Sequence, residues 1–83
     1  VDIDWEFSAD ETRGGRPQDR ENLTAFCEEY IAAAELEAAE SGKPRLLLTM
    51  AVGAHKSGAV EVEKLGKLLD WVNMMTYDLY GAW

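Results

Sequence analysis

The chain of 83 residues carries 16 acidic and eight basic side chains, which give it a formal net charge of −8. A surface of this charge repels nucleic acids and anionic membranes, so we expect neither as a partner. Hydrophobic residues make up 47% of the chain, as in one small globular domain, but no apolar run approaches the ~20 residues of a membrane span.

The first seven residues, Val1–Phe7, read V-D-I-D-W-E-F and place an acid at every second position. This period predicts a β-strand, in which successive side chains leave on opposite faces. One face then carries Asp2, Asp4 and Glu6, with neighbouring acids about 6.6 Å apart. Two full charges at that separation repel by roughly 2.5 kcal/mol at an effective dielectric constant of ~20. If this face is buried, at least one acid should keep its proton near neutral pH, as a general acid must.

Two other interpretations of this stretch compete with the catalytic one. An amphipathic strand of an antiparallel sheet would simply turn its acids toward water. A calcium-binding EF-hand loop would require Gly where Phe7 stands and a bidentate Glu where Arg13 stands, so that pattern fails. The remainder of the chain has to decide between a catalytic row and a solvated strand face.

Residues 8–16 are polar and contain a Gly pair, which predicts a loop. A helix should follow from Pro17, which suits a first helical turn, to Ser41, with Gly42 as its left-handed cap. Its apolar residues recur at spacings of three and four, as on one face of a helix. This stripe consists of Leu23, Phe26, Cys27, Tyr30, Ile31 and Ala34. We therefore expect Cys27, the single cysteine, to serve in packing alone.

The second half of the chain predicts two more strands and a shorter helix. Arg45–Val52 is a nearly continuous apolar run, typical of a strand covered on both faces. A loop over residues 53–58 holds His55, for which no partner is visible, and a helix over Val60–Leu69 leads to a strand over Trp71–Tyr77. Alternating strands and helices predict an α/β fold with a parallel sheet. The acids of the first strand then cannot simply face water, because both faces of such a sheet are covered.

The position of polar residues along the predicted sheet also favours an active site. Glu6 and the Tyr77-Asp78 pair stand at the carboxyl ends of their strands, where chemistry collects in barrels of this type. No Gly-rich phosphate loop follows the first strand, which argues against a dinucleotide-binding sheet. The pattern alone does not distinguish a barrel from an open sheet.

Three motifs resemble those of family 18 glycoside hydrolases, the chitinases and their relatives. Asp2-Ile3-Asp4-Trp5-Glu6 is similar to the second half of the family signature D-G-x-D-x-D-W-E, and Leu46–Val52 looks like the family's next strand. Leu69–Trp83 resembles the form D-F-V-N-x-M-T-Y-D-x-x-G-x-W. The resemblance implies a (β/α)8 TIM barrel, of which residues 1–83 would form a β-α-β-α-β part of the catalytic domain, about strands four to six.

The same resemblance implies a role for each matching residue. Glu6 would be the proton donor to the glycosidic oxygen, and Asp4 would orient the substrate's acetamido group. Asp2 would be the buried partner that shares a proton with Asp4, and Tyr77 would hydrogen-bond the acetamido carbonyl. Further substrate contacts would come from Asp78, Met75 and Trp83. No metal ion or organic cofactor is implied.

The chain departs from the family pattern directly after Glu6. Phe7-Ser8 stands where Tyr-Pro usually follows, which removes a hydroxyl and frees a backbone angle that Pro would fix. We expect an altered strand exit and retained chemistry. The leading Asp-Gly of the signature and the final strand, which in the family carries a Trp under the cleaved sugar, are absent from the 83 residues.

The implied function is that of an extracellular chitinase, a retaining, substrate-assisted hydrolase of β-1,4-linked N-acetylglucosamine polymers. Its partners would be chitin or chitooligosaccharides. Two alternatives stay open, a non-catalytic chitin-binding lectin of the same fold and an endo-β-N-acetylglucosaminidase that acts on N-glycans. Because the chain looks like a piece of a longer protein, we expect the 83 residues by themselves neither to fold stably nor to hydrolyse chitin.

Overall fold

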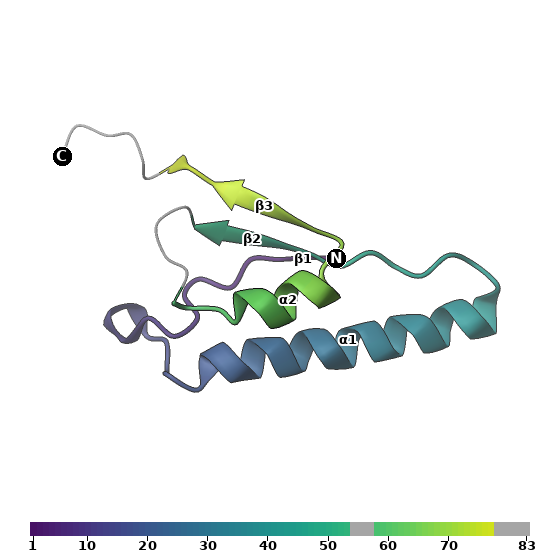
Figure 1. Ribbon diagram of the computed structural model, residues 1–83, viewed down its shortest axis with the longest axis horizontal. Coiled ribbons are helices and arrows are strands. Elements are labelled where there is room, and N and C mark those ends of the chain that lie inside the picture. The colour runs from purple at the N-terminus through teal and green to yellow at the C-terminus, as the bar shows by residue number, and fades with distance from the viewer. Residues whose placement is uncertain (54–57, 78–83) are drawn as a thin grey trace.

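The structure is a computed structural model that describes residues 1–53 and 58–77 (Figure 1). Its elements in chain order are β1 (Asp2–Ile3), a 3-10 helix η1 (Glu11–Arg13), α1 (Asp19–Ser41), β2 (Thr49–Gly53), α2 (Val62–Leu68) and β3 (Trp71–Met75). The three strands form one sheet in the order β1-β2-β3, and both pairings are parallel. The predicted α/β fold with a parallel sheet is confirmed.

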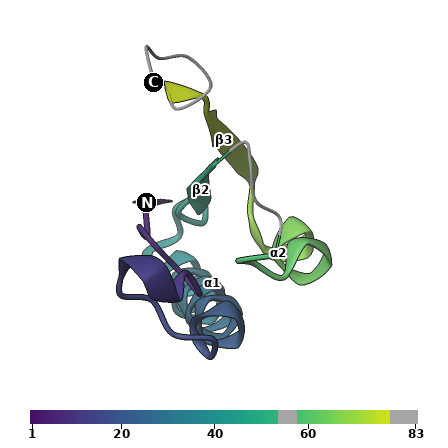
Figure 2. The ribbon, with the colours of Figure 1, turned by 90° about the vertical axis from the view of Figure 1, so that its left-hand side faces the viewer.

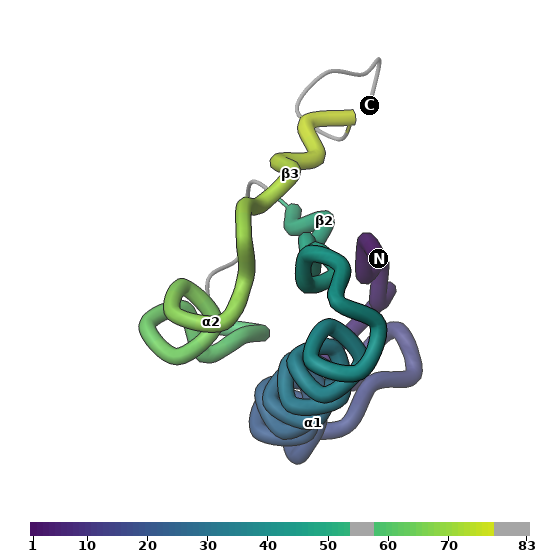
Figure 3. The backbone as a smooth tube through the Cα atoms, turned by 90° about the vertical axis from the view of Figure 1, so that its right-hand side faces the viewer, coloured from purple at the N-terminus to yellow at the C-terminus, as the bar shows by residue number. Residues whose placement is uncertain are grey.

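Both helices lie against the same face of the sheet, as three views agree (Figures 1, 2 and 3). No element of residues 1–53 and 58–77 covers the opposite face. The prediction that both faces are covered is therefore not met within this part of the chain. The uncovered face is the one that receives the side chain of Asp2, which hydrogen-bonds across to Thr49 and Asn73.

The core lies between the sheet and the two helices. Leu48, directly before β2, and Met50 within β2 are two positions apart, so their side chains leave on the same face. Both point to the helices, where they are buried. They pack with Leu23 and Cys27 of α1 and Leu65 of α2. The expected packing role of Cys27 is confirmed, because its side chain is fully buried and this burial raises the pKa of its thiol.

Two large apolar residues of the helices do not enter this core. Phe26 of α1 and Val62 of α2 are both more than half exposed. The stripe of α1 is wider than the contact that the sheet offers, so its buried part runs through Leu23, Cys27 and Ala34. The predicted helix end is confirmed, since Gly42 adopts a left-handed φ of 72° and its N–H donates to the Ala38 carbonyl at 3.0 Å.

The strands are shorter than the sequence predicts. The first was expected over Val1–Phe7, but β1 pairs with β2 only at Asp2 and Ile3, and a turn begins at Glu6. The apolar runs Arg45–Val52 and Trp71–Tyr77 likewise exceed β2 and β3. The alternation of side chains identifies a strand, whereas the length of the ladder depends on how far its neighbour stays alongside.

Ion pairs and hydrogen bonds fix the outer parts of this arrangement. At the amino edge of the sheet, the Asp70 carboxylate accepts from the Leu48 backbone N–H and from Arg45, each at 2.8 Å. These bonds, the backbone one above all, hold the pKa of Asp70 below its ordinary value.

Among the described residues, no helix is both long and apolar enough to cross a membrane.

The two helices are joined at the start of α2. Hydrogen bonds from Thr24 of α1 and from Lys64 lower the pKa of the Glu61 carboxyl. The Glu61 carboxylate lies 3.0 Å from Lys64 Nζ and 3.7 Å from the guanidinium of Arg20. Glu61 therefore links α1 and α2, which both cover the same face of the sheet.

Candidate active site

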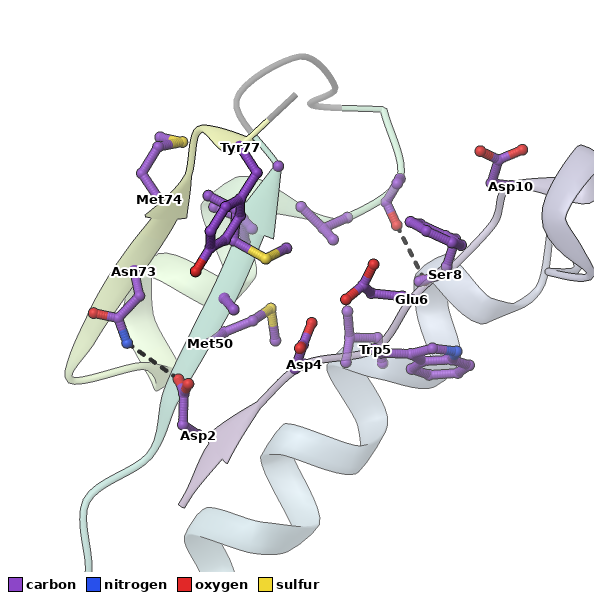
Figure 4. Close-up of a pocket in the computed structure, with 18 of the residues that line it drawn as sticks. Asp2, Asp4, Trp5, Glu6, Ser8, Asp10, Met50, Asn73, Met74 and Tyr77 are labelled. Atoms are coloured by element: carbon purple, nitrogen blue, oxygen red, sulfur yellow. Dashed lines mark hydrogen bonds between the residues drawn. The ribbon is translucent and has the colours of Figure 1, made fainter. Parts of the chain in front are cut away.

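The predicted row of acids lines a single hollow at the carboxyl edge of the sheet (Figure 4). Asp2 belongs to β1, Asp4 follows the strand, and Glu6 stands at the start of the turn. The hollow has a volume of about 950 Å³ and is named the acidic hollow below. Asp2, Asp4 and Glu6 all line it, but so do Trp5 and Phe7, because the chain leaves the extended conformation at Glu6; the predicted separation of acids and apolar residues onto two faces therefore does not extend over the whole stretch.

Asp2 is held by two polar residues from the neighbouring strands. Its Oδ1 accepts a hydrogen bond from Thr49 Oγ1 at 2.7 Å and another from Asn73 Nδ2 at 3.2 Å (Figure 4 draws the second). Thr49 is buried, whereas Asp2 is exposed and not buried as expected. Within the described residues Asp2 bonds to these two residues and not to Asp4, so a proton shared with Asp4 stays a prediction.

Thr49 and Asn73 are functional candidates that the sequence reasoning missed. Both are polar residues within otherwise apolar runs, Thr49 in Leu46–Val52 and Asn73 in Trp71–Met75. The register of the sheet sets Thr49 opposite Asp2 and Asn73 opposite Ala51, on the uncovered face. The interruption of each apolar run by one polar residue was the signal that could have found them.

The carboxylates of Asp4 and Glu6 both point into the acidic hollow (Figure 4). Neither has a hydrogen-bond or ion-pair partner among residues 1–53 and 58–77, and both are exposed. The burial that would force one acid of the row to keep its proton is therefore not present in this part of the chain. The arrangement leaves the oxygens of Asp4 and Glu6 available to a bound molecule.

Tyr77 reaches the acidic hollow from the β3 edge of the sheet, opposite the β1 edge that carries the acids. It follows β3 by two residues, is 84% exposed, and its ring lies across the hollow from Glu6 (Figure 4). Met75 at the end of β3 is half-buried and also lines the hollow, while its contact with a substrate stays a prediction. The predicted substrate contacts Asp78 and Trp83 lie outside the described residues, as does His55.

The segment after Glu6 is tied to the rest of the site. Ser8 is buried, and its hydroxyl donates to the Ala59 carbonyl at 3.3 Å, ahead of α2. The guanidinium carbon of Arg13 lies 4.3 Å from the centroid of the Phe7 ring. Phe7 and Ser8 thus contact two other segments, the 3-10 helix through Arg13 and the loop before α2 through Ala59. That chemistry is retained although Phe-Ser replaces Tyr-Pro stays a prediction.

No cluster of three or more His, Cys, Asp or Glu side chains within residues 1–53 and 58–77 is arranged to hold a metal ion. What this part of the chain assembles is a set of oxygen acceptors, one phenol and one guanidinium around an open hollow. Such a set can bind hydroxyl and amide groups and can transfer a proton to an oxygen atom.

A family model described as glycosyl hydrolases family 18 matches residues 1–83, the whole chain. The chain belongs to this family. Among curated proteins it is 39% identical over 85 residues to chitotriosidase-1 of Mus musculus, a match that covers 99% of this chain and 18% of that protein. The chain thus spans about a fifth of the length of such a relative.

Solved structures of the same family superpose on the chain. A chitinase from Trichuris suis gives a TM-score of 0.81 at 38% identity, over 99% of this chain and 21% of that one. A class V chitinase mutant from Nicotiana tobaccum, in complex with NAG4, gives 0.76 at 37% identity, over 96% and 22%. A chitinase-like agglutinin from Robinia pseudoacacia gives 0.78 at 37% identity, over 95% and 23%.

Proposed function

We propose that the full-length protein is a chitinase that hydrolyses β-1,4 bonds between N-acetylglucosamine units, with Glu6 as the proton donor. The observation that carries this proposal is that Asp2, Asp4, Glu6 and Tyr77, which are up to 75 positions apart in the chain, line one hollow. Similarity to a structure solved with NAG4 supports a chitooligosaccharide as the ligand.

In the proposed reaction the substrate supplies its own nucleophile. Glu6 donates its proton to the bridging oxygen while the N-acetyl carbonyl oxygen of the sugar attacks the anomeric carbon. The glycosidic bond breaks, the chain beyond it leaves as an alcohol, and an oxazolinium ion forms. Water then attacks the same carbon, Glu6 takes up its proton, and the configuration at that carbon is retained.

The other three residues would prepare the acetamido group for this attack. Tyr77 would hydrogen-bond the carbonyl from the β3 side, and Asp4 would accept from the N–H and stabilise the positive ring. Asp2 would act behind Asp4 from a position that Thr49 and Asn73 fix. Because Asp4 and Glu6 have no partner of their own among the described residues, both can take up these roles without first breaking a bond.

We further propose that β1, β2 and β3 are the fourth to sixth strands of a (β/α)8 barrel in the catalytic domain. The parallel order of the three strands and the covering of one face by both helices support this placement. In a closed barrel the acidic hollow would lose much of its water, which is the condition for a protonated Glu6. An extracellular location is a prediction from the family alone.

A chitin-binding lectin is the second candidate, because one structural match is to a chitinase-like agglutinin. A lectin needs the sugar contacts but no proton donor. Glu6 in its place within the acidic hollow, together with Asp4 and Tyr77, favours the enzyme. The two functions differ in turnover and not in binding.

The test is Glu6→Gln in the full-length protein, which keeps the size of the side chain and removes its acid. We expect the rate of cleavage of a fluorogenic chitooligosaccharide to fall by about 10²–10⁴-fold, with oligosaccharide affinity retained. Glu37→Gln, on the exposed surface of α1, is the matched control and should keep full activity. Equal rates for wild type and Glu6→Gln would refute the role of Glu6, and binding without turnover in the wild type would identify a lectin.

A further inference from the structure

We propose that Arg13, held by Phe7 and Asp10, forms a sugar subsite beside Glu6 that raises the preference of the acidic hollow for N-acetylglucosamine over its deacetylated form, glucosamine. This inference rests on the proposed function, because it concerns an oligosaccharide that extends past Glu6. All three residues line the acidic hollow; Phe7 stands where the family pattern continues with Tyr, whereas Asp10 and Arg13 lie outside the motifs by which the chain resembles its family.

Arg13 carries the single positive charge among the described residues that line the hollow. The carboxylates on the same lining belong to Asp2, Asp4, Glu6 and Asp10. The guanidinium lies 4.3 Å from the Phe7 ring centroid, and its Nε lies 3.7 Å from Asp10 Oδ2. Stacking on the ring and pairing with the acid hold the planar group in one orientation.

The backbone around Arg13 is built to keep this position. Asp10 Oδ1 accepts from the Thr12 N–H at 3.1 Å and from the Thr12 hydroxyl at 2.6 Å, and so begins the 3-10 helix η1 that carries Arg13. Gly14 ends it with a left-handed φ of 87°. A Cβ on Gly15 would lie 2.3 Å from the Phe7 carbonyl oxygen, so the close return of the loop to Phe7 requires glycine there.

The subsite lies on the opposite side of Glu6 from Tyr77. Figure 4 shows Asp10 and Tyr77 flanking Glu6 across the acidic hollow. If Tyr77 binds the acetamido group of the sugar whose bond is cleaved, the Phe7 and Arg13 side receives the sugar across that bond. Arg13 would therefore bind the leaving part of the oligosaccharide.

The chemistry of Arg13 suits one form of that sugar. A guanidinium offers five N–H donors, which fit the neutral acetamido carbonyl and the hydroxyl oxygens of N-acetylglucosamine. Glucosamine carries an ammonium group in place of the amide, which the acids of the hollow would attract and Arg13 would repel. Without Arg13 the lining described here would be purely acidic and would favour the deacetylated sugar.

The experiment measures affinity in the full-length protein with Glu6→Gln present, so that it does not depend on turnover. The probes are fully N-acetylated chitotetraose and its fully deacetylated counterpart, compared by calorimetry at low salt. Arg13→Ala should lower the ratio of acetylated to deacetylated affinity by about tenfold, which corresponds to 1.4 kcal/mol. Lys43→Ala, which also removes an exposed positive charge but follows α1 far from the hollow, should leave the ratio unchanged.

Arg13→Lys separates charge from shape. It should keep the repulsion between position 13 and the deacetylated oligosaccharide but weaken binding of the acetylated one, because an ammonium lacks the planar fork and its stacking on Phe7. An unchanged ratio in Arg13→Ala, or a protein that binds neither probe, would overturn the subsite. A wild-type protein without hydrolysis would contradict the proposed function only, while a fall of the ratio in Arg13→Ala would still support the subsite.

Discussion

The carboxylates at the amino and carboxyl edges of the sheet differ in whether they have hydrogen-bond partners. At the amino edge, Asp70 receives hydrogen bonds from the Leu48 N–H and from Arg45, and its pKa is lowered. At the carboxyl edge, Asp4 and Glu6 face the acidic hollow without a partner among the described residues. The first kind of acid stabilises the fold, whereas the second is available to a ligand.

The same contrast separates the two faces of the sheet. The helix side holds the buried core of Leu23, Cys27, Leu48, Met50 and Leu65. The uncovered side holds polar contacts between Asp2, Thr49 and Asn73. Mutations on the two sides should therefore affect different measurements, stability on one side and kinetics on the other.

The largest effect on stability is expected from Leu48→Ala in the full-length protein. Leu48 is fully buried between the sheet and both helices, so its truncation leaves a cavity and should cost about 2–5 kcal/mol in free energy of unfolding. Denaturant titration measures this loss, and kcat of the folded fraction should change little. The exposed Leu36 on α1 provides the control, since Leu36→Ala should be nearly neutral. Equal losses in the two variants would show that the core does not lie where the structure has it.

A smaller and purely kinetic effect is expected from the two residues that hold Asp2. Asn73→Ala and Thr49→Val each remove one donor to its carboxylate and should lower kcat by about tenfold, since a hydrogen bond to a charged group contributes about 1.5–3 kcal/mol when fully formed. A shift in the pH profile of kcat in both variants would support the proposed sharing of a proton between Asp2 and Asp4.

Asn22→Ala, on the exposed surface of α1, is the control for Asn73→Ala and should leave both kcat and its pH profile unchanged. A loss of stability with an unaltered pH profile in the Asn73 and Thr49 variants would assign them to the fold and not to the site.

The smallest effect is expected at the amino edge. Asp70→Asn keeps the shape of the side chain but loses the charge that pairs with Arg45, so the denaturant midpoint should fall by less than in Leu48→Ala, with kcat unchanged. Because the folded-state pKa of Asp70 is lowered, its contribution is present above the unfolded value and is lost as pH falls through the folded one.

Glu61 follows the same sign, since Thr24 and Lys64 also lower its pKa. Acid should therefore weaken the fold below about pH 4, in the ordinary carboxyl range. Asp70→Asn should flatten this acid dependence in a pH series of denaturant midpoints. An identical acid dependence in wild type and variant would show that Asp70 does not contribute to the acid sensitivity of the fold.

The sequence determined which face of the first strand carries the acids, because strict alternation forces Asp2, Asp4 and Glu6 onto one side wherever the backbone is extended. It also determined the end of α1, since only a residue without a Cβ adopts the φ of Gly42 at no cost. The parallel order of the strands followed from their alternation with helices.

Only the tertiary structure decided the lengths of the strands, the donors to Asp2 and the place of Arg13. Each of these depends on a neighbour distant in sequence or on how a loop returns, such as Thr49 opposite Asp2 across 47 positions or Gly15 against Phe7. A local residue pattern predicts the conformation of its own segment, but it does not predict which distant segment packs beside it.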